Sequence, residues 1–225
     1  DNSAAEGSYL LTAAEEEILR NVCNAFARTI VVLNVGNIMD MKWVDRYQPQ
    51  AVLYVWQGGQ EGGAGAADVL TGTVTPCGKL SDTIALDISD YPSTEGFGDP
   101  TRVIYKEDIY VGYRYYETAA ADGYIDYDAT VQYPFGYSLS YTTFDEKIAD
   151  FSDDGTTITM TVDVTNSGDV AGKDVVEAYY SAPYTPGGIE KSAVVLAGFD
   201  KTKLLEPGET QTLKISWTHE DMASY

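Results

Sequence analysis

The first third of the chain carries two hydrophobic patterns, one with helical spacing and one continuous. Between residues 13 and 28, hydrophobic side chains recur every three or four positions: Ile18, Leu19, Val22, Cys23 and Phe26. Thr12 lies three residues before Glu15, which is the spacing of a capping box. We therefore expect an amphipathic helix over 13–28.

Two short runs, 30–35 (IVVLNV) and 51–56 (AVLYVW), are hydrophobic at nearly every position. Strands without a polar face are typical of buried parallel sheets, so we expect helices to cover both faces of these strands. Further helices are expected over 39–47 and 63–70. The order helix, strand, helix, strand, helix predicts a doubly wound, mostly parallel sheet with helices on both faces.

Regular periodicity is lost between residues 89 and 144. Eleven of the 18 tyrosines lie in 89–141, among Asp-Pro, Tyr-Pro and glycine turns. We expect a long, extended connection that packs on the neighbouring domains. Tyrosines at this density are more typical of domain interfaces, where the ring is buried and the hydroxyl hydrogen-bonded, than of carbohydrate stacking.

From about Asp145 onward, hydrophobic positions alternate with polar ones. The alternation involves four side chains within one run: Ile158, Met160, Val162 and Val164. Three later segments repeat it between turns: 173–181, 193–199 and 210–217. This pattern predicts a β-sandwich. About 80 residues follow Asp145, fewer than the roughly 100 of a complete immunoglobulin-like sandwich, so we expect its final strands to be absent.

The chain is strongly acidic, with 35 acidic and 14 basic residues and a formal charge of −21. Its field would repel phosphate backbones and anionic membrane surfaces, so we expect no nucleic-acid and no membrane partner. The acidity suits a protein that acts on a neutral ligand such as a sugar. A solvated surface that limits association explains it equally well.

Cysteine and histidine are too few and too scattered for a metal site. Cys23 and Cys77 have no metal-ligand spacing, and His219 has only acidic neighbours, so we expect no metal and no organic cofactor. Two lone cysteines indicate a reducing, cytoplasmic compartment. Secretion stays open, because larger secreted enzymes also manage without disulfides.

Four blocks of the sequence occur in an order that points to a known family. They are Trp56–Thr83, Glu107–Thr118 (EDIYVGYRYYET), Pro134–Phe144 (PFGYSLSYTTF), and the pair Asn166–Pro183 with Leu204–Trp217. Together they resemble the carboxyl-terminal half of family-3 glycoside hydrolases, a family with many β-glucosidases.

The resemblance implies an α/β region followed by an all-β one. A partial α/β sandwich domain is expected over 1–88, the Tyr-rich connection over 89–144, and a fibronectin type III-like β-sandwich, incomplete, over 145–225. It also implies that both ends of the chain are cut through domains.

The resemblance further implies a retaining β-glycosidase that hydrolyses terminal β-linked glucosides or xylosides with two carboxyl groups about 5 to 5.5 Å apart. In that family the nucleophile is an Asp of a separate (β/α)₈ barrel. The acid/base is a Glu that precedes the helix starting here near Thr12. We expect the nucleophile in a barrel absent from this chain and the acid/base just upstream of Asp1, with Glu6 as the alternative. Ser81-Asp82 resembles the family's nucleophile pair but closes a turn, so the chain alone is expected to be inactive.

The glycine-rich loop between the strand 51–56 and the helix 63–70 carries four candidate substrate-binding side chains: Trp56, Gln57, Gln60 and Glu61. Ligands bind at the carboxyl edge of open α/β sheets, where free amides of the next helix also point. Trp56 would offer a flat hydrophobic face to a pyranose ring. In the structural alternative, Trp56 belongs to the core and the glycines serve helix packing.

A dinucleotide is another ligand that this loop suggests. Gly63 and Gly65 match part of a phosphate-binding fingerprint, but Asp68 stands where Gly or Ala is needed. Two functions therefore stay open. The chain is part of a β-glycosidase, with a β-linked oligosaccharide or glucoside and the barrel as partners, or it is a non-catalytic carbohydrate-binding or partner-docking module. Self-association into a homo-oligomer also stays open.

Overall fold

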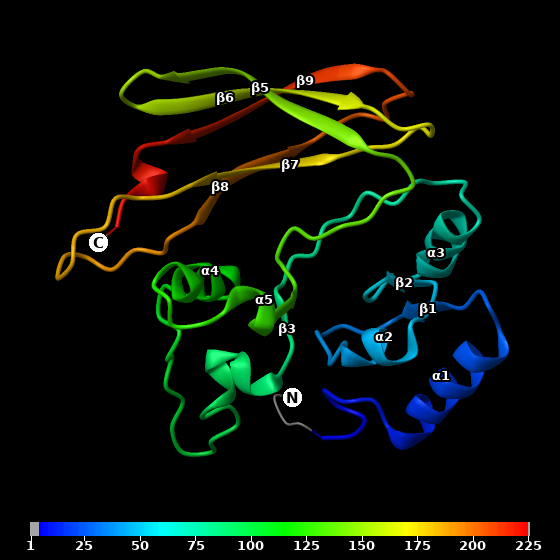
Figure 1. The fold of residues 1–225 in the computed structure, drawn as a ribbon. Helices are drawn as coiled ribbons and strands as arrows, with labels where there is room; N and C mark the ends of the chain where they lie inside the picture. The colour runs from blue at the N-terminus through cyan, green and yellow to red at the C-terminus, as the bar shows by residue number, and fades with distance from the viewer. Residues whose placement is uncertain (1–4, 225) are drawn as a thin grey trace.

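Two lobes and a region between them make up residues 5–224, the part of the chain that this computed structural model describes (Figure 1). The first lobe is a small parallel sheet with its helices. The second lobe is a β-sandwich. The order of the lobes confirms the predicted fold class, α/β followed by all-β.

The first lobe has its elements in the predicted order: α1 (Ala13–Ala25), β1 (Ile30–Leu33), α2 (Lys42–Tyr47), β2 (Ala51–Tyr54) and α3 (Gly62–Leu70). The capping box at the start of α1 is confirmed. The Glu15 N–H donates to Thr12 Oγ1 (3.3 Å), and the Thr12 N–H donates to Glu15 Oε2 (2.8 Å). β1 and β2 pair in parallel over four residues each.

One face of this two-stranded sheet is covered and the other is open. The covered face packs against a hydrophobic core. Its five buried side chains are Leu33, Met39, Met41, Trp43 and Ile84. On the other face, the side chains of Ile30 and Val32 are 52% and 41% exposed. Within the described residues, this part of the second face therefore has no covering layer over β1.

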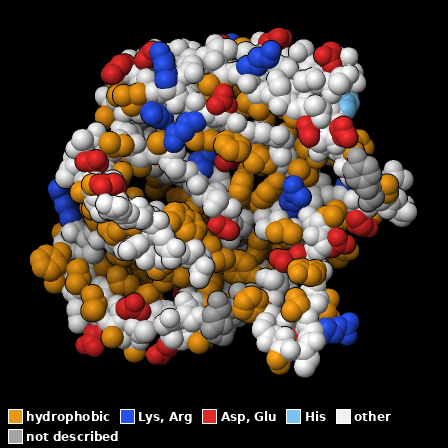
Figure 2. Space-filling model, turned by 180° about the vertical axis from the view of Figure 1, so that it is seen from behind, with side chains coloured by type: hydrophobic (Ala, Val, Ile, Leu, Met, Phe, Trp, Pro, Cys, Tyr) orange, Lys and Arg blue, Asp and Glu red, His pale blue; other side chains and the backbone are white. Residues whose placement is uncertain are grey.

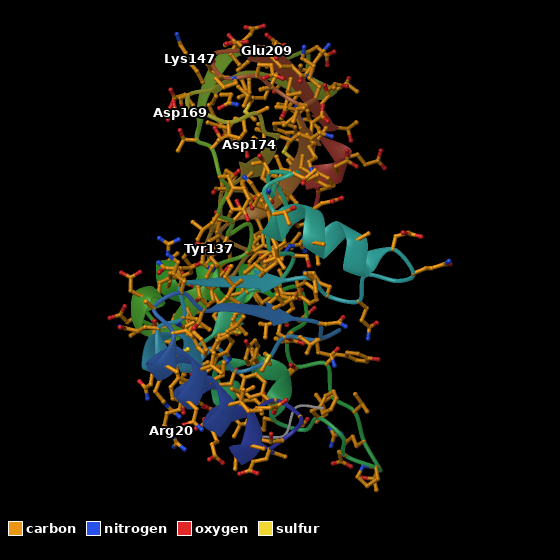
Figure 3. All side chains as sticks on the ribbon, turned by 90° about the vertical axis from the view of Figure 1, so that its right-hand side faces the viewer. Arg20, Tyr137, Lys147, Asp169, Asp174 and Glu209 are labelled. Atoms are coloured by element: carbon orange, nitrogen blue, oxygen red, sulfur yellow. The ribbon has the colours of Figure 1, made fainter. Side chains whose placement is uncertain are left out.

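Helices of the first lobe are also incompletely covered. No residue of α1 or α3 is fully buried, and Figure 3 shows α3 projecting from the rest of the molecule, with Arg20 of α1 pointing into solvent. Hydrophobic side chains gather at the surface of this lobe, below the sandwich (Figure 2). None of the described helices is long and hydrophobic enough to cross a membrane.

The region between the lobes contains more regular structure than the sequence predicts. Its elements are β3 (Ile84–Ala85), η1 (Ile88–Asp90), η2 (Pro92–Thr94), α4 (Tyr113–Ala121), α5 (Tyr127–Thr130) and β4 (Val131–Tyr133). The expectation of a purely extended connection is wrong here, because the alanines that end α4 favour a helix and Asp126 caps α5 through the Ala129 N–H. β4 pairs with β3, so the chain returns to the first lobe. The domain boundaries at 88/89 and 144/145 stay predictions.

Tyrosines of this region connect the two lobes, as predicted for an interface. The ring of Tyr113 on α4 stacks on Phe135 (4.6 Å between ring centres) and meets Tyr179 of the sandwich edge-on at 6.1 Å. The Leu196 N–H, also in the sandwich, donates to Tyr113 Oη (2.7 Å). Tyr137 lies between the lobes in Figure 3. α4 is therefore one of the links to the sandwich, besides the hydrogen bond from Thr75 Oγ1 to the carbonyl oxygen of Ala171.

The sandwich has two antiparallel sheets. One contains β5 (Phe144–Asp153), β6 (Thr157–Asn166) and β9 (Thr210–Thr218), and the other β7 (Val175–Tyr180) and β8 (Val195–Lys201), followed by the short η3 (Glu220–Met222). The alternation predicted around β6 is confirmed, because Ile158, Val162 and Val164 are buried between the sheets. The sequence missed β5, whose register shifts between Ile148 and Asp150.

The buried side-chain amide of Asn166 connects three segments at one corner of the sandwich. Asn166 is fully buried, and its Oδ1 accepts from Thr142 Oγ1 at 2.7 Å. Its Nδ2 donates to the carbonyl oxygens of Val170 (2.8 Å) and Leu205 (2.9 Å). Every polar atom of this side chain is thus paired, as a buried amide requires.

Candidate functional site

A pocket of about 390 Å³ opens at the carboxyl edge of β1 and β2. Six of its lining residues come from five separate segments: Tyr9, Asn37, Trp56, Asp82, and Tyr91 with Phe97. The loop after β1 and the loop after β2 form adjacent walls, because parallel strands bring their carboxyl ends to the same edge. The pocket lies where the sequence predicted a ligand site.

Trp56 adopts a strained backbone conformation beside this pocket. Its φ is +51°, a left-handed conformation that costs a bulky residue about 1–2 kcal/mol. Its ring packs on the ring of Tyr54, with 4.4 Å between centres. The Tyr54 hydroxyl in turn donates to the carbonyl oxygen of Asn37 in the other wall. These contacts hold Trp56 at the pocket, and strain of this kind is often found at functional sites.

Gln57 lies against the loop that follows β1. A Cβ at Gly36 would come within 2.7 Å of Gln57 Nε2, so the exposed Gln57 side chain would have to move aside for a larger residue there. Gly36 lines the pocket. Gln57 therefore lies beside one wall, with an amide that can donate and accept hydrogen bonds.

The other two predicted side chains lie apart from the pocket. Gln60 and Glu61 are exposed at the start of α3, and the Glu61 side chain makes no capping bond there. Neither lines the pocket. The structure thus brings Trp56 to the pocket, places Gln57 beside the Gly36 wall without lining it, and leaves Gln60 and Glu61 on the open side of the loop. Substrate binding by all four stays a prediction.

Asp82 is a lining residue that the sequence did not single out for binding. Its Oδ2 accepts a hydrogen bond from Ser81 Oγ (3.0 Å). The sequence assigns Ser81-Asp82 to the close of a turn, yet Asp82 lies next to β3 and lines the pocket. Asn37 was missed in a similar way. Its signal in the sequence is its position directly after a buried parallel strand.

Burial, and after it nearby carboxylates, raise the pKa values of the tyrosines around the pocket. Burial and then the charge of Asp82 raise the pKa of Tyr54 to about 12. Burial also raises the pKa of Tyr91, with Asp82 and Asp90 acting in the same direction. The hydroxyls therefore stay neutral hydrogen-bonding groups at physiological pH.

Glu6 lies outside this pocket. It is exposed and pairs with Leu10 in an isolated bridge, next to Gly7 and Ser8 of a second pocket of about 410 Å³. The position expected for the acid/base, just upstream of Asp1, lies outside the described residues. Within residues 5–224, Asp82 is the one carboxylate that lines the first pocket.

A metal or dinucleotide site has little support in this lobe. Residues 5–224 hold no cluster of three or more His, Cys, Asp or Glu side chains that could bind a metal ion. Gly63 and Gly65 lie inside α3 instead of forming a loop before it. A phosphate cradle needs these glycines in the turn that precedes the helix.

Comparison with known families matches most of the chain. Residues 2–113 match the family described as glycosyl hydrolase family 3 C-terminal domain. Residues 174–225 match the fibronectin type III-like domain. The matches agree with the two lobes seen in the structure.

Proteins of similar sequence are β-glucosidases. The chain is 52% identical over 226 residues to a β-glucosidase of Ruminococcus albus, which covers 100% of the chain and 23% of that protein. It is 48% identical over 236 residues to β-glucosidase A of Butyrivibrio fibrisolvens, covering 97% of the chain and 28% of that protein.

Solved structures of similar fold are β-glucosidases as well. That of a β-glucosidase from Paenibacillus barengoltzii has a TM-score of 0.91 at 45% identity, covering 100% of this chain and 24% of the other. That of β-glucosidase 3B from Thermotoga neapolitana in complex with glucose has a TM-score of 0.89 at 38% identity, covering 99% of this chain and 31% of the other. The chain thus spans about a quarter to a third of the length of these relatives.

Proposed function

The chain belongs to glycosyl hydrolase family 3, and from this membership we propose that it is the C-terminal part of a retaining β-glycosidase. The complete protein would hydrolyse terminal β-linked glucosides, or xylosides. One observation carries this proposal: 52% identity to a β-glucosidase along the whole chain.

In this enzyme, the first lobe would supply a wall of the sugar site. Trp56 would stack on the pyranose ring, because its indole lines the pocket and is held there by Tyr54. Gln57 would hydrogen-bond to sugar hydroxyls from the same loop. Gln60 and Glu61 would meet a ligand only on the open side of that loop.

The two catalytic carboxyl groups would come from elsewhere in the complete protein. A retaining mechanism needs a nucleophile and an acid/base about 5 to 5.5 Å apart. Among the described residues, Asp82 is the only carboxylate that lines the pocket. We place the nucleophile in a (β/α)₈ barrel and the acid/base just upstream of Asp1. The 225-residue chain by itself would then be inactive.

The open face of the first lobe is where the rest of the protein would pack. Ile30 and Val32 lie exposed on β1, Ile18 on α1, and Phe26 directly after α1. Exposed hydrophobic side chains gathered on one lobe (Figure 2) are typical of surfaces that another part of a protein covers.

Hydrolysis of 4-nitrophenyl β-glucoside tests the proposed function. We expect turnover by the complete protein and none by the 225-residue chain. In the complete protein, Trp56→Ala should lower kcat/KM about tenfold, mainly through KM, because a stacking contact is lost. Tyr124→Ala is the control, since this exposed tyrosine lies outside the pocket. A complete protein without β-glucosidase activity, or an active 225-residue chain, would contradict the proposal.

A non-catalytic carbohydrate-binding module is the second candidate. The presence of Trp56 with a single carboxylate in the pocket favours it. Calorimetric titration of the complete protein with cello-oligosaccharides separates the two candidates, because binding without hydrolysis would favour the module. We also propose a cytoplasmic location, supported by Cys23 and Cys77, which are both free.

A further inference from the structure

The carboxylate of Asp82 has no cation beside it. Its one hydrogen bond within residues 5–224 comes from Ser81 Oγ, and no Lys or Arg of the described chain lies within ion-pair distance. By contrast, Asp40 and Asp87 share the ammonium group of Lys42, at 3.3 and 3.4 Å. Asp82 therefore brings an uncompensated negative charge to the pocket wall.

A second carboxylate near the pocket also lacks a cation. Asp40 and Asp87 act on the pKa of Tyr9, after its burial and its contact with Tyr91, but both are paired with Lys42. Burial raises the pKa of Tyr91, and Asp82 and Asp90, neither of which has an ion pair within residues 5–224, act in the same direction. The lining residues include no Lys, Arg or His. The pocket thus has a negative potential within a chain of formal charge −21.

Aromatic side chains complete this environment. Trp56, Tyr91 and Phe97 line the pocket together with Asp82. The faces of aromatic rings attract cations, most strongly when water is partly excluded. A carboxylate beside aromatic rings is the combination that binds an organic ammonium group, whereas it repels a carboxylate ligand.

We propose that this pocket is a subsite for a pyranose with a protonated amino group, with the ammonium on Asp82 and the ring against Trp56. The pocket would bind an amino sugar more tightly than the neutral sugar, and the neutral sugar more tightly than the uronate; this order of affinities is the ranking. The sugar class rests on the proposed function. The ranking by charge rests on the residues of the pocket alone.

Three ligands that differ mainly in charge test the ranking: methyl β-glucosaminide, methyl β-glucoside and methyl β-glucuronide. Their dissociation constants are measured with the 225-residue chain by NMR titration, at low salt and at a pH where the amine is protonated. We expect the glucosaminide to bind about tenfold tighter than the glucoside, a usual gain for a charge-assisted hydrogen bond. The glucuronide should bind more weakly than both.

Asp82→Asn keeps the size of the side chain and removes its charge. With this variant, the three dissociation constants should fall within about threefold of one another, because the remaining contacts do not distinguish the ligands by charge. Asp68→Asn is the matched control. It removes the same unit of charge from an exposed position on α3 outside the pocket and should leave the ranking unchanged.

Trp56→Ala separates stacking from charge. It should weaken all three ligands by a similar factor and keep their order. If Asp82→Asn leaves the ranking as it is, or if the wild-type chain binds the glucoside without preferring the glucosaminide, the inference is overturned and the proposed sugar wall stands. If the wild-type chain binds none of the three ligands, the inference is overturned, because it claims a subsite built from residues of this chain. The sugar wall, which acts together with the rest of the protein, is tested separately by Trp56→Ala in the complete protein.

Discussion

Strands β6 and β1 contain similar hydrophobic side chains and differ in what covers them. In β6, Val164 is 0% exposed, and the inward-facing side chains belong to one core between two sheets. In β1, Val32 is 41% exposed, although it lies in a run with hydrophobic residues at almost every position. Hydrophobicity alone therefore does not say whether a strand of this chain is buried.

The two hydrophobic patterns require different numbers of covering layers. An alternating strand such as β6 needs one covering layer, and the facing sheet of β7 and β8 supplies it. A strand that is hydrophobic on both faces needs two layers and strands at both edges. The first lobe supplies only one layer among the described residues. This lobe also contains the pocket, so the proposed sugar wall lies in the lobe whose sheet is covered on only one face.

The largest expected effect is the loss of stability when the buried amide of Asn166 is removed from the sandwich. Asn166→Ala should lower the free energy of unfolding by about 3 kcal/mol, because it leaves the buried Thr142 hydroxyl without its acceptor and removes the amide donors to the carbonyl oxygens of Val170 and Leu205, of which only that of Leu205 keeps another donor, the Gly172 N–H. Urea denaturation of both proteins measures this loss. Ser167→Ala is the control, and this exposed neighbour should change stability by less than about 0.5 kcal/mol. Equal losses for the two variants would contradict the role of the buried amide.

The same substitution in both lobes compares them directly. Val164→Ala should lower the free energy of unfolding by about 2 kcal/mol, since it opens a cavity in a closed core. Val32→Ala should cost less than about 1 kcal/mol, because solvent already reaches this side chain. Denaturant titrations of the two variants check the difference. If Val32→Ala cost as much as Val164→Ala, the open face of β1 would have to be covered in solution.

Two substitutions at Trp56 measure the strain at the pocket. Both remove the indole, but glycine adopts a φ of +51° without penalty and alanine does not. Trp56→Gly should therefore be about 1 kcal/mol more stable than Trp56→Ala. Thermal unfolding followed by circular dichroism gives the difference. An alanine variant as stable as the glycine variant would mean that the loop relaxes and stores no strain.

The smallest expected effect depends on pH. Burial, and then the charge of Asp174, raise the pKa of Glu146 in the folded sandwich. The protonated form is thus favoured on folding, and its stabilisation is complete below the unfolded pKa near 4.5 and lost as pH rises through the folded value.

Glu146→Gln should therefore change little at pH 4 and stabilise the protein at pH 7, by less than about 0.5 kcal/mol because solvent screens the charges. Urea titrations at both pH values measure this. Glu17→Gln, at an exposed position on α1, is the control and should show no such dependence. Stabilisation at pH 4 as large as at pH 7 would contradict the role of the charge.

The sequence predicts local patterns in this chain better than contacts between distant segments. The capping box of α1 and the alternation of β6 depend on residues a few positions apart, and both are confirmed. The bulge in β5 hides its alternation, and α4 is only nine residues long. Both were therefore missed.

In the candidate site too, the sequence predicts residues of one contiguous segment and misses those that come from distant segments. Trp56 and Gln57 could be proposed because a strand, a glycine-rich loop and a helix are contiguous in the sequence. Asp82 and Tyr91 reach the pocket from separate segments, and only the folded chain brings them beside Trp56. The charge around the pocket therefore became visible only in the structure.

Amide hydrogen exchange of the 225-residue chain tests the contrast between the lobes most directly. The account predicts that the amides of β6 and β9 exchange at least about a hundredfold more slowly than those paired between β1 and β2, because only the sandwich closes its own core. In the complete protein, the β1 and β2 amides should gain protection. Equal protection of the two sets in the chain alone would contradict the claim that the lobe with the sugar pocket depends on a partner.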